Sequence, residues 1–130
     1  MKALKVLLLA LLLAAPTLAQ DILPFGVSIG GQAAAKKEGD ANFAHLPGPV
    51  ASGAAMTVKG ATGQVIVNIF PSDAKGVVAQ GAAPEILLFD AKESKSINEN
   101  MNKKKIAPGW YAANVVCGPL GTSRVLFQVK

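Results

Sequence analysis

The chain has 130 residues, a formal net charge of +5 and a single cysteine. One cysteine cannot form an internal disulfide, so packing rather than cross-linking has to stabilise the fold. Such a small positive charge, without a clustered basic stripe, argues against a nucleic-acid-binding protein. A chain of this length accommodates one domain with a core the size of a β-sandwich.

The first 19 residues have the plan of a secretory signal peptide. Two lysines in residues 1–5 precede a continuous apolar run over residues 6–15, and residues 16–19 supply a break and a small residue at the expected cleavage site. The run is too short for a membrane-spanning helix, which needs about 20 apolar residues. We expect a bacterial protein whose single domain, residues 20–130, is secreted or periplasmic, without stable membrane insertion after cleavage. Of the 13 Lys and Arg and the 8 Asp and Glu, cleavage removes two lysines and leaves a net charge of +3.

The first expected strand covers residues 22–29, where Pro24 and Gly26 are typical of an edge or bulged strand. The next stretch, residues 30–54, is rich in Ala, Gly and Pro. We expect this Gly30 to Ala54 stretch to form a long loop that holds at most one helical turn, over residues 32–38. Loops of this length in compact domains are commonly functional or mobile.

Residues typical of strands return in two runs, 56–59 and 64–70. The four residues between them include Gly60 and Gly63, and a short Gly-containing segment between such runs predicts a hairpin. Residues 71–76 have the composition of a loop. Two further strands are expected after it, a short edge strand at 77–80 and a more apolar strand at 85–90.

Residues 91–105 are polar and end in three consecutive lysines. Ile97 and Met101 form only one apolar i,i+4 pair, which is too few for an amphipathic helix. We expect a solvated loop with at most one helical turn. The lysines are typical of a solvated surface that limits edge-to-edge association, and so small a net charge gives little steering of anions.

The last 25 residues, 106–130, predict two strands joined by a tight turn at 117–121. Successive side chains of a strand point to opposite faces. On this pattern the inward residues are Tyr111, Ala113, Val115, Cys117, Val125, Phe127 and Val129. The outward residues are Trp110, Ala112, Asn114, Val116, Arg124, Leu126 and Gln128. The polar side chains all fall on the outward side, which supports this register.

Six or seven strands with turn signals and no long helix predict an antiparallel β-sandwich. The run 106–111, Ile-Ala-Pro-Gly-Trp-Tyr, with the alternating residues and closing strand after it, resembles the approach to the penultimate strand of bacterial immunoglobulin-like and fibronectin-type-III-like domains. The resemblance implies an all-β, antiparallel immunoglobulin-like β-sandwich of about seven strands. It also implies that Tyr111 makes a corner hydrogen bond to nearby backbone. It implies no activity, and the inter-sheet disulfide of antibody domains is absent.

The residues that carry catalytic or metal chemistry are scattered. His45, Met56 and Met101 have no second ligand at close spacing, so we expect no metal and no cofactor. The chain has no Gly-x-Ser-x-Gly sequence, and Gly60 and Gly63 lack the lysine and helix of a phosphate-binding loop. We expect no enzyme activity. A small secreted hydrolase is the alternative, and it would have to use loop carboxylates, namely Asp73, Glu85, Asp90 and Glu93.

Two interpretations of Cys117 stay open. A buried, inert thiol fits its inward strand position, because free cysteine is among the most buried residue types. An unpaired cysteine in an exported protein also fits a disulfide between two chains. A catalytic thiol would need an activating base, and His45 is far away in the sequence.

The outward residues predict a recognition surface. In immunoglobulin-like order the strand 64–70 pairs with the strand that begins at Trp110, and one sheet then has an outer side of apolar residues interleaved with polar ones. Such a patch is typical of a docking surface. Its candidate binding residues are Ile66, Asn68, Phe70, Trp110, Asn114, Arg124 and Leu126.

This surface leads to two expectations and one objection. We expect docking of a protein partner or of a second copy of the chain, without catalysis. The alternative is a carbohydrate-binding module in which Trp110 stacks on a sugar ring and Asn68 or Asn114 supplies hydrogen bonds. The objection is that residues 30–54 could cover this side of the sheet, since buried strands also have continuous apolar runs.

Overall fold

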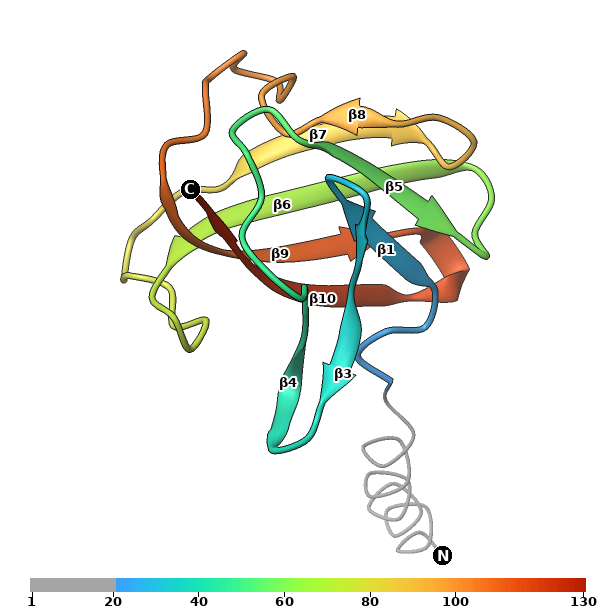
Figure 1. The fold of residues 1–130 in the computed structure, drawn as a ribbon. Coiled ribbons are helices and arrows are strands. Elements are labelled where there is room, and N and C mark those ends of the chain that lie inside the picture. The colour runs from blue at the N-terminus through green and yellow to red at the C-terminus, as the bar shows by residue number, and fades with distance from the viewer. Residues whose placement is uncertain (1–20) are drawn as a thin grey trace, which may run out of the picture.

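The computed structural model describes residues 21–130, so the predicted signal peptide, residues 1–19, lies outside the described residues. Within them, ten strands form two packed sheets, a four-stranded sheet in the order β2-β1-β5-β8 and a six-stranded sheet in the order β3-β4-β10-β9-β6-β7 (Figure 1). The strands are β1 Gly26–Ile29, β2 Gln32–Ala33, β3 Ala35–Lys37, β4 Asp40–His45, β5 Ala55–Lys59, β6 Gln64–Ser72, β7 Glu85–Asp90, β8 Lys95–Ser96, β9 Gly109–Val116 and β10 Thr122–Val129. The prediction of an all-β sandwich is confirmed.

The C-terminal hairpin is present as predicted. β9 and β10 pair in antiparallel register from Val116 opposite Thr122 to Gly109 opposite Val129. A single turn of 3-10 helix, η1 Gly118–Leu120, joins them. The inward residues of both strands belong to the main core, and Tyr111 packs against it partly buried. Alternation alone therefore gave the correct faces of this hairpin.

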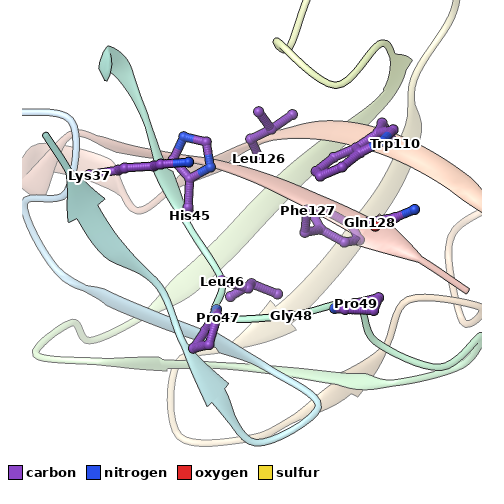
Figure 2. Close-up of a pocket in the computed structure, with 10 residues that line it drawn as sticks. All are labelled: Lys37, His45, Leu46, Pro47, Gly48, Pro49, Trp110, Leu126, Phe127 and Gln128. Atoms are coloured by element: carbon purple, nitrogen blue, oxygen red, sulfur yellow. The ribbon is translucent and has the colours of Figure 1, made fainter. Parts of the chain in front are cut away.

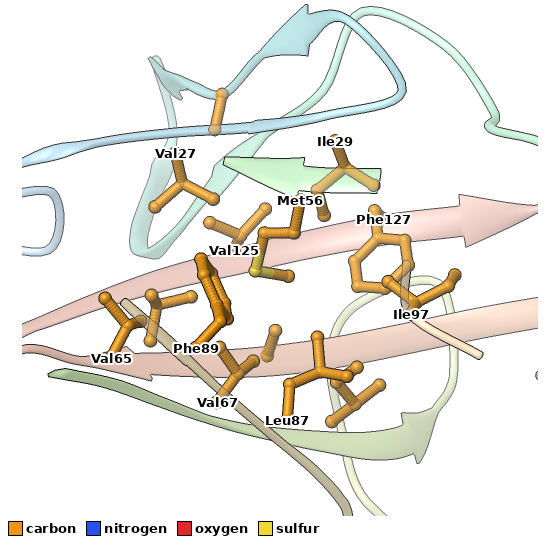
Figure 3. Close-up of a cluster of buried hydrophobic side chains, with 14 of the residues drawn as sticks. Val27, Ile29, Met56, Val65, Val67, Leu87, Phe89, Ile97, Val125 and Phe127 are labelled. Carbon is orange, nitrogen blue, oxygen red and sulfur yellow. The ribbon is translucent and has the colours of Figure 1, made fainter. Parts of the chain in front are cut away.

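The main core lies between the two sheets (Figure 3). Alternate residues of β6 and β7 point into it, and β1 and β5 close it from the other sheet. The side chains that fill it from these four strands are Val27, Ile29, Met56, Val65, Val67, Ile69, Leu87 and Phe89. Burying one such side chain contributes about 1.5–3 kcal/mol, so this layer stabilises the sandwich without any disulfide.

Tyr111 makes the hydrogen bond that the resemblance implies. Its hydroxyl donates to the carbonyl oxygen of Ala107 at 2.7 Å, and its ring lies 5.9 Å from that of Phe127. We expect Tyr111→Phe to lower the free energy of unfolding by about 1 kcal/mol in urea denaturation, because only this bond is lost. Burial raises the pKa of Tyr111 above 10.0, so the bond is intact at neutral pH and is lost only as pH rises through the raised pKa. Equal stability of the two proteins would show that the bond contributes nothing.

The hairpin predicted across Gly60 and Gly63 is wrong. β5 belongs to the four-stranded sheet, where it pairs with β1 and β8, whereas β6 belongs to the six-stranded sheet between β7 and β9. The connection carries the chain from one sheet to the other, with φ values of 82° at Gly60 and 86° at Gly63. A short glycine-containing segment suits such a crossing as well as a hairpin, because both need positive φ.

The long loop predicted at residues 30–54 is also wrong. It contains β2, β3 and β4, and the helical turn expected over 32–38 is replaced by strands. The chain changes sheets here, since β2 pairs with β1, Ala34 is buried, and β3 pairs with β4. β4 then lies parallel to β10, and the β3–β4 hairpin extends beyond the body of the sandwich (Figure 1). Pairing with strands distant in the sequence overrides the weak strand propensity of Ala, Gly and Lys.

Three smaller differences concern the ends of two strands and the burial of residues 91–105. The first strand begins at Gly26 rather than at residue 22. β6 extends to Ser72, and the strand expected at 77–80 is reduced to one bridge between Val78 and Ser72. Residues 91–105 contain the short β8 and bury Ile97 and Asn100 completely, so this segment is not merely solvated.

Candidate binding face and cleft

We call the side of the six-stranded sheet that points away from the four-stranded sheet the outer face. Cross-strand pairing aligns its side chains in rows, because residues directly opposite one another lie side by side. All seven predicted binding residues belong to these rows. After the pair Gln64–Asp90 at one end of the sheet, the rows are Val116–Ile66–Leu88, then Arg124–Asn114–Asn68–Ile86, then Leu126–Ala112–Phe70, then Gln128–Trp110–Ser72.

Two residues of the third row, Leu126 and Ala112, are covered by the chain itself. Leu126 is only 1% exposed and forms a second small core with Ala112 and Phe43, against which Val78 and Trp110 pack. Phe43 comes from β4 and Val78 from the segment between β6 and β7. The expectation that Leu126 contacts a partner directly is therefore wrong. Part of the 30–54 segment does cover the face, as the objection anticipated: Phe43 lies over Leu126 and packs against the guanidinium of Arg124.

The other rows stay accessible. Ile66 is 39% exposed and Leu88 37% exposed, and they are cross-strand partners. Phe70 and Trp110 are half-buried. The outer face therefore presents an apolar row, a polar row and two aromatic side chains around a covered centre.

The polar row has no internal partners. Asn68 and Asn114 are half-buried and directly opposite each other, yet neither side chain takes part in a hydrogen bond within the described residues. Arg124 completes the row. Its guanidinium carbon lies 4.7 Å from the centre of the Phe43 ring, and it belongs to none of the ion pairs among residues 21–130. Half-buried amide and guanidinium groups with free hydrogen-bonding capacity can bind a ligand.

A notch of about 210 Å³ opens beside this row. Its walls are the rings of Phe43 and Phe70 together with Val78, and Asn114 and Arg124 stand at its edge. Gly76 passes so close to Phe43 that an added Cβ would lie 2.4 Å from the ring. The segment between β6 and β7 thus forms one wall of the notch and is closely packed there.

A larger cleft of about 430 Å³ lies between the β3–β4 hairpin and the ends of β9 and β10 (Figure 2). Trp110 and Gln128 line one side, and Lys37 and His45 come from the hairpin on the other side. The segment Leu46, Pro47, Gly48 and Pro49 borders the cleft as well. Of the residues that line the cleft, only Trp110 and Leu126 were predicted as binding residues. The hairpin residues Lys37 and His45 could not be, because only the pairing of β4 with β10 brings them to this end of the sheet.

The hairpin is stabilised by Asp40. Its carboxylate accepts hydrogen bonds from the backbone amides of Asn42 at 2.8 Å and Phe43 at 3.1 Å, and its second oxygen lies 2.6 Å from Nε2 of His45. The hydrogen bond with His45 is the main cause that holds the pKa of Asp40 below its ordinary value. These bonds orient both Phe43, which covers Leu126, and His45, which lines the cleft.

Three of the four carboxylates predicted for a hydrolase, Asp73, Asp90 and Glu85, are bonded within their own turns or to a neighbouring segment. Asp73 accepts hydrogen bonds from the backbone amides of Val77 and Lys75, which lower its pKa, while Asp90 accepts one from the backbone amide of Lys92. Glu85 contacts side chains of the 91–105 segment. Glu38 and Asp40 share a shallow hollow at the hairpin tip, where Asp40 is bonded to His45.

The structure also describes the candidate metal ligands and the single thiol. No group of three or more His, Cys, Asp or Glu side chains is arranged to hold a metal ion within residues 21–130. Cys117 is 1% exposed, and its sulfur lies 3.2 Å from the carbonyl oxygen of Thr62. This placement is that of a buried thiol, and a disulfide between chains would require the sheet to open first.

The fold and the outer face define a small β-sandwich with an accessible polar row, an apolar notch and a tryptophan-lined cleft. Comparison with protein-family models matched no family, and no similar protein was found among curated proteins or among solved structures. In the part of the chain that the structure describes, no helix is long and apolar enough to cross a membrane.

Proposed function

We propose that this protein is an exported, noncatalytic binding module that docks a protein partner on its outer face. We propose further that its sandwich is of the immunoglobulin-like type. The strand order supports this assignment, since β10-β9-β6-β7 faces β1-β5-β8 and β4 runs parallel to β10. The Tyr111 hydrogen bond adds a second feature of such domains.

One observation supports docking above the others. Accessible apolar side chains, Ile66, Phe70 and Trp110, share a face with Asn68, Asn114 and Arg124, whose polar groups have no partner within the described residues. Interface centres in proteins combine such apolar area with hydrogen-bonding groups, and Trp and Arg dominate their binding energy.

The test compares how much partner protein the unmodified domain and its surface variants capture when they are immobilised. A double variant, Trp110→Ser with Ile66→Ser, is expected to lose a protein that the unmodified domain captures from the exported protein fraction. Met101→Ser is the matched control, because Met101 is 62% exposed and lies in the loop that follows β8. Self-association is measured in parallel by sedimentation velocity with and without reductant, and reductant is expected to have no effect because Cys117 is buried. Equal capture by both variants would contradict docking at this face.

Carbohydrate binding is the second candidate, favoured by the larger cleft. Trp110 borders it together with the amide of Gln128, the imidazole of His45 and the ammonium of Lys37, a combination suited to a sugar ring and its hydroxyls. Trp110 is the only tryptophan of the chain, so its fluorescence reports directly on this cleft. A glycan array without hits and an unchanged emission spectrum would exclude this candidate.

A further inference from the structure

We infer that the docked partner is an acidic polypeptide segment that seats one apolar side chain in the notch between Phe43 and Phe70. The carboxylate groups of this segment bind the guanidinium of Arg124, and the side chains of Asn68 and Asn114 form hydrogen bonds to its backbone. This inference rests on the proposed docking function and specifies the chemistry of the partner. Three independent features of the outer face lead to it.

The first feature is the notch. At about 210 Å³ it is smaller than the pockets of several hundred Å³ that hold whole small molecules, and it suits a single side chain. Its walls are the two phenylalanine rings and Val78. Burial of one apolar side chain there removes apolar area from water and so adds to the affinity of a docked segment.

The second feature is charge. The outward positions of β6, β9 and β10 carry no acidic side chain, and Arg124 is the only charged residue among them. On the two segments that wall the notch, Asp40 binds His45 and Asp73 binds the backbone of its own turn. Asp90, the outward residue of β7 opposite Gln64, bonds to the backbone of Lys92. Lys37 and Lys75 add positive charge on the adjoining hollow at the hairpin tip, against one further carboxylate, that of Glu38.

The third feature is the geometry of the polar row. Stacking on Phe43 holds the guanidinium of Arg124 at the edge of the notch while its N–H groups form no hydrogen bond to residues 21–130. A guanidinium oriented in this way can bind a carboxylate through two parallel hydrogen bonds. Each asparagine amide supplies both a donor and an acceptor, the two groups that a peptide backbone needs. An acidic residue beside an apolar residue meets all three features at once.

An acidic polysaccharide matches only part of this surface. It supplies carboxylates and hydroxyls, but it has no side chain to fill a notch with aromatic walls. The tryptophan that would stack on a sugar ring lies in the other cleft. The observations therefore favour the polypeptide, and polygalacturonate becomes one arm of the test.

The experiment follows backbone amide NMR shifts of the exported protein with four probes. Three are blocked five-residue peptides: phenylalanine flanked by glutamates, phenylalanine flanked by lysines, and serine flanked by glutamates. The fourth is polygalacturonate. We expect the phenylalanine–glutamate peptide to shift the amides of Asn114 and Arg124, with an affinity at least about tenfold higher than the other two peptides.

Variants complete the test. Arg124→Gln is expected to weaken binding of the phenylalanine–glutamate peptide about tenfold, and Arg124→Lys is expected to give an intermediate affinity. Lys59→Gln, at an exposed position of β5 in the other sheet, is expected to change nothing. The amide spectrum of each variant shows whether it is folded. Equal affinity of the lysine-flanked peptide, or an effect of Lys59→Gln as large as that of Arg124→Gln, would overturn the inference while leaving a docking face. Binding of polygalacturonate alone, or of no probe on the outer face, would also overturn it. Neither result would alter the Trp110-dependent capture that tests docking itself.

Discussion

Replacing Asn100 by alanine is expected to lower the free energy of unfolding by about 3 kcal/mol, because four buried or part-buried backbone groups lose their partner together. The side-chain amide of Asn100 is fully buried. Its nitrogen donates to the carbonyl oxygens of Ile97 at 2.9 Å and Lys104 at 2.7 Å. Its oxygen accepts from the amides of Asn102 at 3.2 Å and Lys104 at 3.0 Å. One side chain thus replaces the hydrogen bonds that a strand or helix would supply to this segment.

Asn102→Ala is the matched control. It removes the same side chain two residues away, where the amide is exposed and makes one bond, to Glu85 at 3.0 Å. We expect the free energy of unfolding to fall by less than about 1 kcal/mol, measured by urea denaturation with Trp110 fluorescence as the signal. Asn100→Asp tests the mechanism, because it keeps the acceptors and loses both donors, and it should destabilise as well. Similar losses for Ala at 100 and at 102 would show that burial of Asn100 has no special role.

Gly76→Ala is expected to destabilise the fold by about 2–4 kcal/mol, from overpacking against Phe43 together with strain at positive φ. An added Cβ would lie 2.4–2.9 Å from three ring carbons of Phe43, and Gly76 has φ of 87°. Either the ring or the 73–77 turn has to move. Because both form walls of the notch, the affinity for the phenylalanine–glutamate peptide should fall together with stability.

Gly81→Ala separates the two causes. Gly81 has nearly the same φ, 84°, but a Cβ there meets nothing within 4 Å. We expect only the conformational cost of about 1–2 kcal/mol and an unchanged notch. Thermal unfolding and the peptide titration measure both quantities. Equal effects at Gly76 and Gly81 would mean that contact with Phe43 does not shape the outer face.

The C-terminal hairpin could be predicted because its signals are local. Between Trp110 and Val129 each strand alternates between a buried and an outer side, and a glycine-rich turn separates them. The wrong hairpin at Gly60 had equally good local signals. Alternation tells which side of a strand is buried but not which strand lies beside it, so β5 and β6 could not be assigned to different sheets.

The candidate site was likewise predictable where it depends on local pattern and not where it depends on distant strands. Predicting Ile66, Asn68, Phe70, Trp110 and Arg124 for one face required only the register of three neighbouring strands. The sequence predicted the correct face for Leu126 but not that another side chain buries it. That cover comes from Phe43, whose strand follows a stretch with the composition of a loop.

By itself, the sequence determined the all-β class, the two faces of the C-terminal strands and the absence of an internal disulfide, since composition and period-two alternation express these properties locally. Only the tertiary structure decided that β4 lies beside β10. That one pairing covers Leu126 with Phe43, places His45 and Lys37 opposite Trp110, and sets the ring of Phe43 beneath Arg124. Contacts between strands some 80 residues apart leave no local pattern, because their free energy depends on the assembled sheet rather than on either segment.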